Sequence, residues 1–161
     1  MTQHLRYTIC LFAITLLIRN CIIAQSFTIA PPNPIFRIST PTAFGNSKTG
    51  NIVVSFSLTN YSISKAQFQL FPYEIKAIDE LNVQHIPISI VLGRKTYRKQ
   101  EVIAIDLAPG DSTSFQMLFS KFNKETRYIP QVTAKNRVIM QPLFDQVSIL
   151  NVQGLVVYWQ K

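Results

Sequence analysis

The sequence predicts an all-β fold in which antiparallel strands form a two-layer sandwich. The clearest strand lies at 50–60, where Val54, Phe56 and Leu58 alternate with hydroxyl-bearing residues. This alternation gives one dry and one wet face, as in a half-buried strand. Further alternating segments follow, separated by Gly, Pro, Asn and Asp, and no amphipathic run after residue 24 reaches helical length. Several short strands separated by such turn residues are typical of an antiparallel sandwich.

The length and composition indicate one folded domain. The chain has 161 residues, of which 47% are apolar, and this is ordinary for a single packed core. We expect three segments: a leader at 1–24, a proline-rich lead-in with a first short strand at 25–49, and the β-sandwich domain at 50–161.

The first 24 residues resemble a secretory signal peptide. A polar start is followed by an apolar run at 8–18, and the small residue Ala24 marks the expected cleavage site. The run is shorter than the roughly 20 apolar residues that a membrane-spanning helix needs. The alternative is an uncleaved anchor. Arg19 and Asn20 interrupt the apolar run, and Ile22, the third residue before the expected cleavage site, is larger than the Ala that is usual there.

Both cysteines, Cys10 and Cys21, lie in this leader. The mature chain therefore has no disulfide, no thiolate nucleophile and no Cys-ligated metal. Lipid modification of Cys21 is not expected, because the residues before it are not small and apolar. An exported domain without disulfides is typical of a bacterial envelope, so we expect a periplasmic or extracellular location.

The chain is basic. Its formal net charge is +8, and loss of Arg6 and Arg19 with the leader leaves +6. A basic exported protein is attracted to an acidic partner protein, an acidic glycan or an anionic lipid headgroup. Nucleic acid is not expected as a partner in that compartment.

In chain order, the segment 26–34 is a lead-in or edge, because it contains Pro31, Pro32 and Pro34. A short strand at 35–38 and a polar loop up to Gly50 follow. Pro72 predicts a bulge or a strand boundary between two extended segments. Strands are expected at 50–60, 67–71, 73–78, 85–92, 102–107 and 113–119.

The turns between these strands are supplied by 79–82 and by 108–111, the latter with Pro and Gly where tight turns favour them. After Phe119 a charged loop or single helical turn is expected at 120–130. Further strands are expected at 132–140 and 144–150, and Gly154 opens a separate terminal strand at 155–159.

Part of this order resembles a known group. The order is a strand, the turn Leu58-Thr59-Asn60-Tyr61-Ser62, a second strand, a long insert, the turn Leu107-Ala108-Pro109-Gly110-Asp111-Ser112, and a strand ending in Leu118-Phe119. This order resembles that of the Ig-like, telokin-like extracellular domains of bacterial exported proteins. The resemblance covers Gly50 to Phe119. It implies an Ig-like β-sandwich with no assigned chemistry. Unlike antibody domains, this sequence has no Cys pair in the sandwich, and Trp159 stands at its end.

The strand followed by an Asn-x-Ser turn also resembles the N-terminal Ig domain of periplasmic pilus chaperones. That resemblance implies an alternative function, in which an exposed sheet edge accepts a strand from a partner. Those chaperones have two domains, whereas this chain has room for one.

Few residues suit catalysis. His85 is the one histidine after the leader, and it is expected at the surface at the start of a strand. A His-ligated metal site and a Ser-His-Asp triad therefore lack their residues. Carboxylate pairs leave a carbohydrate-active hydrolase as a further alternative. The candidate pairs are Glu74 with Asp79 and Glu101 with Asp106. We expect no catalytic residue, metal or cofactor.

The sharpest surface feature is the cluster Arg94-Lys95-Thr96-Tyr97-Arg98-Lys99. Gly93 before it favours a protruding hairpin tip. The candidate binding residues for an anionic partner are Arg94, Lys95, Arg98 and Lys99, with Tyr97 as a stacking surface. The simpler interpretation is a solvated loop that keeps a strand edge from aggregating. The sequence thus predicts an exported, non-catalytic binding or structural module of the cell envelope that touches membrane only through an uncleaved leader.

Overall fold

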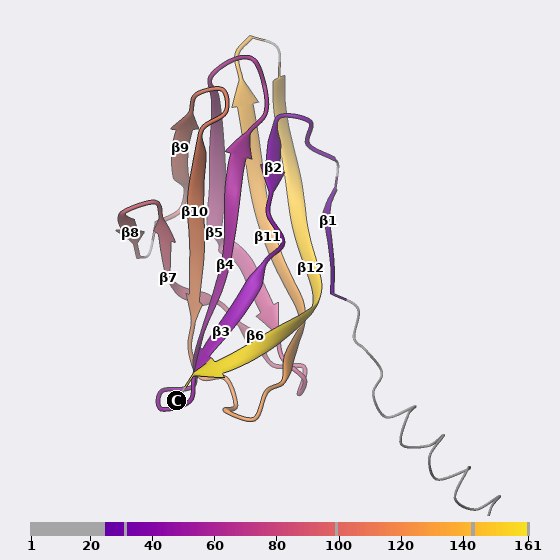
Figure 1. The fold of residues 1–161 in the computed structure, drawn as a ribbon, viewed down its shortest axis with the longest axis vertical. Helices are drawn as coiled ribbons and strands as arrows, with labels where there is room; N and C mark the ends of the chain where they lie inside the picture. The colour runs from indigo at the N-terminus through magenta and orange to yellow at the C-terminus, as the bar shows by residue number, and fades with distance from the viewer. Residues whose placement is uncertain (1–24, 31, 99, 143, 161) are drawn as a thin grey trace, which may run out of the picture.

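The computed structural model describes residues 25–30, 32–98, 100–142 and 144–160. The predicted leader at 1–24 lies outside these residues. The described chain is all-β and has no helix, so the predicted fold class is confirmed at this level (Figure 1). Its strands are β1 (Ser26–Ala30), β2 (Phe36–Ile38), β3 (Thr42–Asn46), β4 (Asn51–Asn60), β5 (Ala66–Ile78), β6 (Gln84–His85), β7 (Pro87–Leu92), β8 (Lys95–Tyr97), β9 (Ile103–Leu107), β10 (Ser112–Phe119), β11 (Tyr128–Met140) and β12 (Phe144–Gln160).

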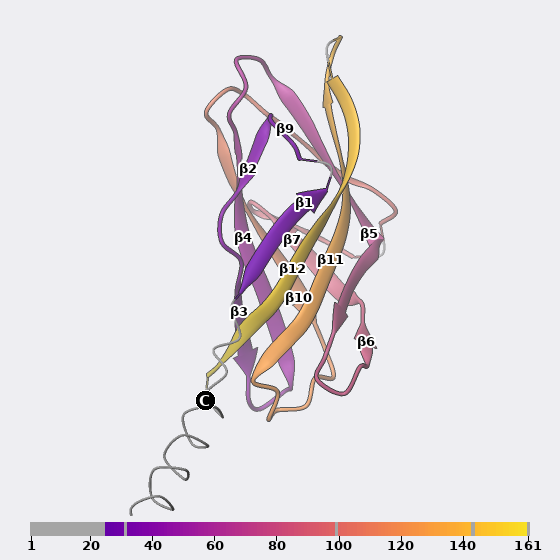
Figure 2. The ribbon, with the colours of Figure 1, turned by 90° about the vertical axis from the view of Figure 1, so that its right-hand side faces the viewer.

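The strands form two layers that face each other. The β11 layer consists of β5, β11 and the first part of β12, with β1, β6 and β9 at its margins. The β4 layer consists of β3, β4, β10 and β7, with β2 and β8 at its margins. Figure 2 shows the molecule from the side on which β1 lies against β12.

Strand β12 belongs to both layers. Residues 144–156 pair with β11, whereas Val157 to Gln160 pair with β3. The buried side alternates as Leu150, Val152 and then, out of phase, Leu155 and Val157. Gly154 stands at this change of phase with φ +65°, a conformation that glycine adopts without steric cost. Because the register against β11 is the same on both sides of Gly154, the strand turns here from one layer into the other without an inserted residue.

The β3–β12 pair is parallel. The prediction of a purely antiparallel sandwich is therefore wrong, and the sheet is mixed. The short parallel ladder exists because β12 crosses between the layers and meets β3 running in the same direction.

The core forms as the alternation predicts. Along β4, Val54, Phe56 and Leu58 are buried, and the residues between them are half-buried on the outer face. Between the layers the ring of Phe115 stacks on Phe56 at 5.2 Å and meets Phe68 edge-on at 5.5 Å. Phe56 and Phe115 are neighbours within the β4 layer, whereas Phe68 lies on β5, so the contact between Phe68 and Phe115 joins the two layers.

Three segments differ from the sequence-based expectation. The expected polar loop before Gly50 contains β3, whose Ala43 is fully buried. The bulge expected at Pro72 is present, because the register against β11 shifts there, but the strands expected on its two sides are one long β5. The predicted strands at 144–150 and 155–159 are one continuous β12, because Gly154 bends the strand without ending it.

Trp159 packs against the core at the end where β12 pairs with β3. Its indole Nε1 donates to the carbonyl oxygen of Thr126 at 2.6 Å. A Cβ atom at Gly45 would lie 2.6 Å from Cζ3 of this ring. The indole ring can lie over β3 because Gly45 has no side chain.

Candidate functional site

The predicted basic cluster lies on the β7–β8 hairpin at the edge of the β4 layer. A two-residue turn, Gly93-Arg94, joins the strands, and Gly93 has φ +59°. Arg94, Lys95 and Arg98 are exposed, and none of the three forms an ion pair with a carboxylate of the described residues. Lys99 lies outside the described residues. The hairpin that the sequence predicted is present, and its described basic side chains are accessible.

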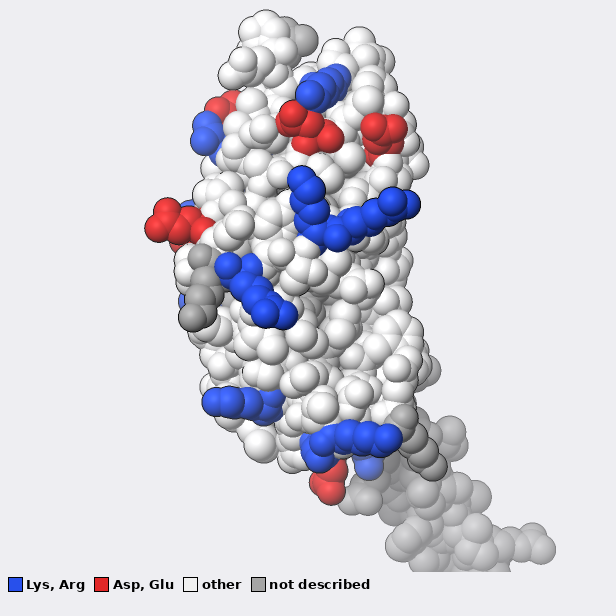
Figure 3. Space-filling view, turned by 90° about the vertical axis from the view of Figure 1, so that its left-hand side faces the viewer, with Lys and Arg blue, Asp and Glu red and all other residues white. Residues whose placement is uncertain are grey.

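Two details of this surface differ from a simple stacking site. Tyr97 is half-buried, pairs with Ile90 across the hairpin and packs against the core. Figure 3 views the molecule from the side of β7, β8 and β9, and its Lys and Arg side chains are spread along that face. The structure therefore offers separate positive charges, with little of the Tyr97 ring free to stack on a ligand.

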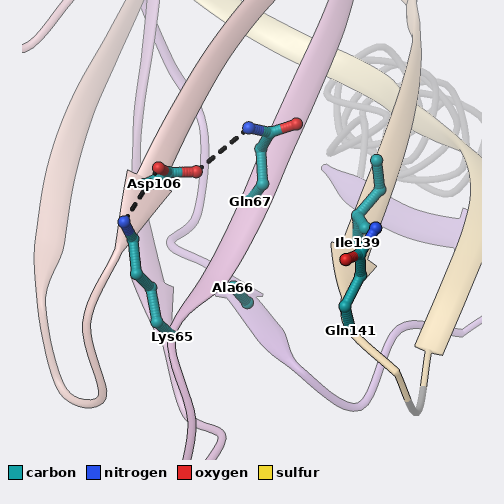
Figure 4. A pocket seen from close by; sticks show the side chains of 6 residues that line it. All are labelled: Lys65, Ala66, Gln67, Asp106, Ile139 and Gln141. Atoms are coloured by element: carbon teal, nitrogen blue, oxygen red, sulfur yellow. Dashed lines mark hydrogen bonds and ion pairs between the residues drawn. The ribbon is translucent and has the colours of Figure 1, made fainter.

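A depression of about 400 Å³ lies on the outer face of the β11 layer, next to β9 (Figure 4). Asp106 accepts a hydrogen bond from Gln67 Nε2 at 3.0 Å and pairs with Lys65 Nζ at 3.0 Å. The contact with Lys65, followed by the hydrogen bond from Gln67, holds the pKa of the Asp106 carboxyl below its ordinary value. Asp106 is therefore ionised at neutral pH and is no proton donor there.

A second depression of about 400 Å³ adjoins the first across Ile139 and Gln141. Its carboxylate, Asp145, accepts a hydrogen bond from Arg137 Nε at 2.7 Å. The contact with Arg137 also keeps the pKa of Asp145 below its usual range. Both depressions thus present ionised carboxylates already matched by cations. Such groups hold polar ligands by hydrogen bonding, and they lack the raised pKa of a glycosidase acid.

His85 is buried, with 8% of its surface exposed, so the prediction of a surface residue is wrong. Its Nε2 donates to Asp79 Oδ2 at 2.9 Å, its Nδ1 faces the carbonyl oxygen of Ser120 at 3.2 Å, and its ring stacks on Phe122 at 3.8 Å. The residue is buried because β6 pairs with the end of β5 beneath the β10–β11 loop.

Asp79 is the anchor of this cluster. Its Oδ1 accepts hydrogen bonds from the amides of Leu81 and Val83, and its Oδ2 accepts that of His85. Burial raises the pKa of Asp79, but the hydrogen bonds from His85 and the two amides outweigh burial and leave the pKa below the ordinary 3.8. Ser120 and Phe122, which cover His85, are 35 or more residues away in the sequence, so no local pattern around His85 indicates its burial.

The carboxylate pairs considered for a hydrolase are committed to different partners. Glu74 lies 3.6 Å from Lys135 Nζ, whereas Asp79 binds His85. Asp106 pairs with Lys65, and Glu101 is exposed next to β9. Glu74, Asp79 and Asp106 therefore each contact a different basic or histidine side chain.

The Asn60-Tyr61-Ser62 triplet has a structural role. Asn60 is fully buried, and its Nδ2 donates to the carbonyl oxygens of Ser64 and Leu107, both at 2.9 Å. Its Oδ1 accepts from Ser62. An amide nitrogen held in this way is inaccessible to a glycosylating enzyme, so the triplet serves the turn.

Within the described part of the chain, no three His, Cys, Asp or Glu side chains are grouped to hold a metal ion. In residues 25–30, 32–98, 100–142 and 144–160, the structure contains no long apolar helix of the kind that crosses a bilayer.

Comparison with known proteins gives a weak likeness to a solved structure. No protein-family model matches the chain, and no curated protein matches it either. Among solved structures, it is similar to the CooA pilin subunit from enterotoxigenic Escherichia coli, with 9% sequence identity and a TM-score of 0.45. That alignment covers 80% of this chain and all of the pilin chain, 100%.

Proposed function

We propose that the chain is a non-catalytic, exported module of the cell envelope that binds a protein partner through the free edge of strand β1. The observation that carries this proposal is the exposure of β1. Four of its five residues are exposed, and Ile29 is the one that is partly covered. Its pairing partner among the described strands is β12, on one side alone. The other edge of β1 offers unpaired amides and carbonyls to an added strand.

This proposal includes an Ig-like sandwich as the architecture and a cleaved signal peptide at 1–24. The two facing layers joined through the Phe56, Phe68 and Phe115 rings support the first. The location of β1 immediately after the leader supports an edge that becomes free for a partner once export is complete.

The chaperone-like alternative uses the same edge, with a partner that is itself an incomplete fold. The short β1, five residues long, favours a brief strand contact over the long one that a chaperone of folding subunits makes. The hydrolase alternative is disfavoured by the cation-matched carboxylates of both depressions.

Proline substitutions test the edge. Successive amides of a strand point to opposite edges, so one of Phe27→Pro and Thr28→Pro removes an outward amide and the other breaks the ladder to β12. We expect the outward variant to keep the thermal midpoint of the parent and to lose the partner captured from an envelope extract. Recovery of the same partner by both folded variants contradicts the proposal.

The basic hairpin is proposed as a second contact, for an acidic protein, an acidic glycan or an anionic headgroup. Reversing three charges in Arg94→Glu/Lys95→Glu/Arg98→Glu is expected to weaken binding to phosphatidylglycerol vesicles by on the order of 10-fold or more at low salt. Vesicle co-sedimentation measures the effect, and binding of the parent should fall as NaCl is added.

The matched control carries the same charge change away from the hairpin, as Lys48→Glu/Lys121→Glu/Lys124→Glu. If the control loses as much binding as the hairpin variant, overall charge and not the hairpin is responsible.

A further inference from the structure

The three central strands of the β4 layer contain no charged residue. The sequences of β3, β4 and β10 are TAFGN, NIVVSFSLTN and STSFQMLF. The outer face of the β11 layer differs, because it carries Lys65, Glu74, Asp106, Lys135 and Arg137. The chain is basic with or without its leader, so two copies repel each other through most of their surface. The uncharged strands are the part where this repulsion is weakest.

This outer face has a ridge. Tyr158, Phe44, Val53 and Leu118 are cross-strand neighbours in one row over β12, β3, β4 and β10. Tyr158 is 59% exposed and Phe44 42% exposed, and their rings meet at 5.9 Å. Aromatic residues are enriched at protein interfaces relative to the rest of the surface.

Beside the ridge lies a groove. It has a volume of about 300 Å³ and is lined by hydroxyl and amide side chains, including Thr42, Ser55, Ser57, Ser114 and Gln116. Thr42, Ser55 and Gln116 form the row next to the ridge. Ridge and groove therefore lie side by side over strands without charged residues, and the exposed Arg37 of β2 lies beside Thr59, beyond the far end of the groove.

We propose that this face binds the same face of a second copy of the chain. A two-fold axis between ridge and groove brings the ridge of each copy onto the groove of the other, which is the self-complementarity of an isologous dimer. Two sheets stacked in this way resemble the aligned packing of β-layers. The inference concerns a different surface from β1 and the β7–β8 hairpin, and it is independent of the function proposed above.

The available area suits a weak dimer. β12 contributes Val157 to Gln160 to this face, β3 has 5 residues, β4 has 10 and β10 has 8. At about 3.3 Å per residue and about 4.8 Å between strands, the face covers on the order of 430 Å² in plan, before the relief of its side chains is counted. A standard stable interface buries about 800 Å² per partner, so we expect a dimer no tighter than the micromolar range.

Sedimentation velocity on the purified protein between about 1 µM and about 300 µM tests this dimer. We expect a concentration-dependent dimer that strengthens when NaCl is added, because salt screens the repulsion between the basic remainders of the two copies. Ser55→Lys places an unpaired charge in the interface and should raise the dimer Kd on the order of 100-fold or more. Gln116→Lys on exposed surface of the same face gives a second variant if Ser55→Lys does not fold.

The matched control is Thr133→Lys, which adds the same charge to the outer face of β11. A parent that is monomeric over the whole range overturns the proposal. So does a folded Ser55→Lys or Gln116→Lys variant that dimerises like the parent, or a Thr133→Lys control that is equally weakened. A monomer that instead binds neutral oligosaccharides, probed with cellohexaose, assigns the face to glycan and overturns the dimer.

Discussion

Replacing Phe115 by alanine is expected to lower the free energy of unfolding by about 3–5 kcal/mol, the usual cost of truncating a buried aromatic residue. Phe115 is fully buried, stacks on Phe56 and meets Phe68 of the opposite layer. Its removal leaves a cavity between the layers, which these rings do not fill without moving their strands. Urea unfolding followed by intrinsic fluorescence measures the change.

The control for Phe115→Ala is Ile63→Ala, which truncates an apolar side chain that is 96% exposed. Its effect should lie within about 0.5 kcal/mol of zero. A Phe115→Ala protein as stable as this control would mean that the two layers do not share the core described above.

Removing His85 is the second large change. His85→Ala leaves the buried Asp79 carboxylate without its side-chain hydrogen bond, and leaving a buried acceptor unsatisfied costs about 1–3 kcal/mol, and more for a charged group. The substitution also removes the ring that stacks on Phe122 and the contact with Ser120. We expect a matching fall in the urea midpoint at neutral pH. Glu80→Ala, which removes an exposed carboxylate from the same turn, should leave the midpoint unchanged.

The same pair predicts a pH dependence with a definite sign. The pKa of Asp79 in the folded protein lies below 3.8, so its contribution to stability is complete above the unfolded pKa of about 3.9. That contribution is lost as the pH falls through the lower, folded pKa. The unfolding free energy of the parent should therefore decline below about pH 4, and His85→Ala should show a shallower decline. Parallel acid profiles for the two proteins would rule out this role of the pair.

Local patterns were sufficient to predict most strands. The alternation of Phe115, Met117 and Phe119 places all three in the core, where they are buried. The turn at 108–111 forms with Gly110 at φ +78°, as its Pro and Gly indicate. These features depend on neighbours in the sequence, and the sequence displays them directly.

Features that depend on distant partners were not predictable in this way. β3 was expected to be a loop, because Thr42 to Asn46 has few apolar residues, yet it lies between β4 and β12. A glycine that opens a strand and one that bends a continuous strand look alike in sequence, and the role of Gly154 is decided by where β11 and β3 lie. His85 was misplaced for the same reason, since its burial is caused by the β10–β11 loop.

The candidate surfaces show the same division. The β7–β8 hairpin follows from Gly93 and its flanking residues, and Arg94, Lys95 and Arg98 are exposed as expected. The burial of Tyr97 follows from its pairing with Ile90, which no local pattern reveals. The ridge of Phe44 and Tyr158 joins residues from opposite ends of the chain, so it is visible in the folded structure alone.

The shared strand β12 also governs how the chain reaches its native state. β1 and β3 lie near the start of the described chain, and both pair with β12 at its end. Such long sequence separations make for a high contact order and slow folding. Until the last residues arrive, β1 stays without its ladder and the core stays open beside β3. The chain thus remains, for that interval, exposed to aggregation and to assisting factors.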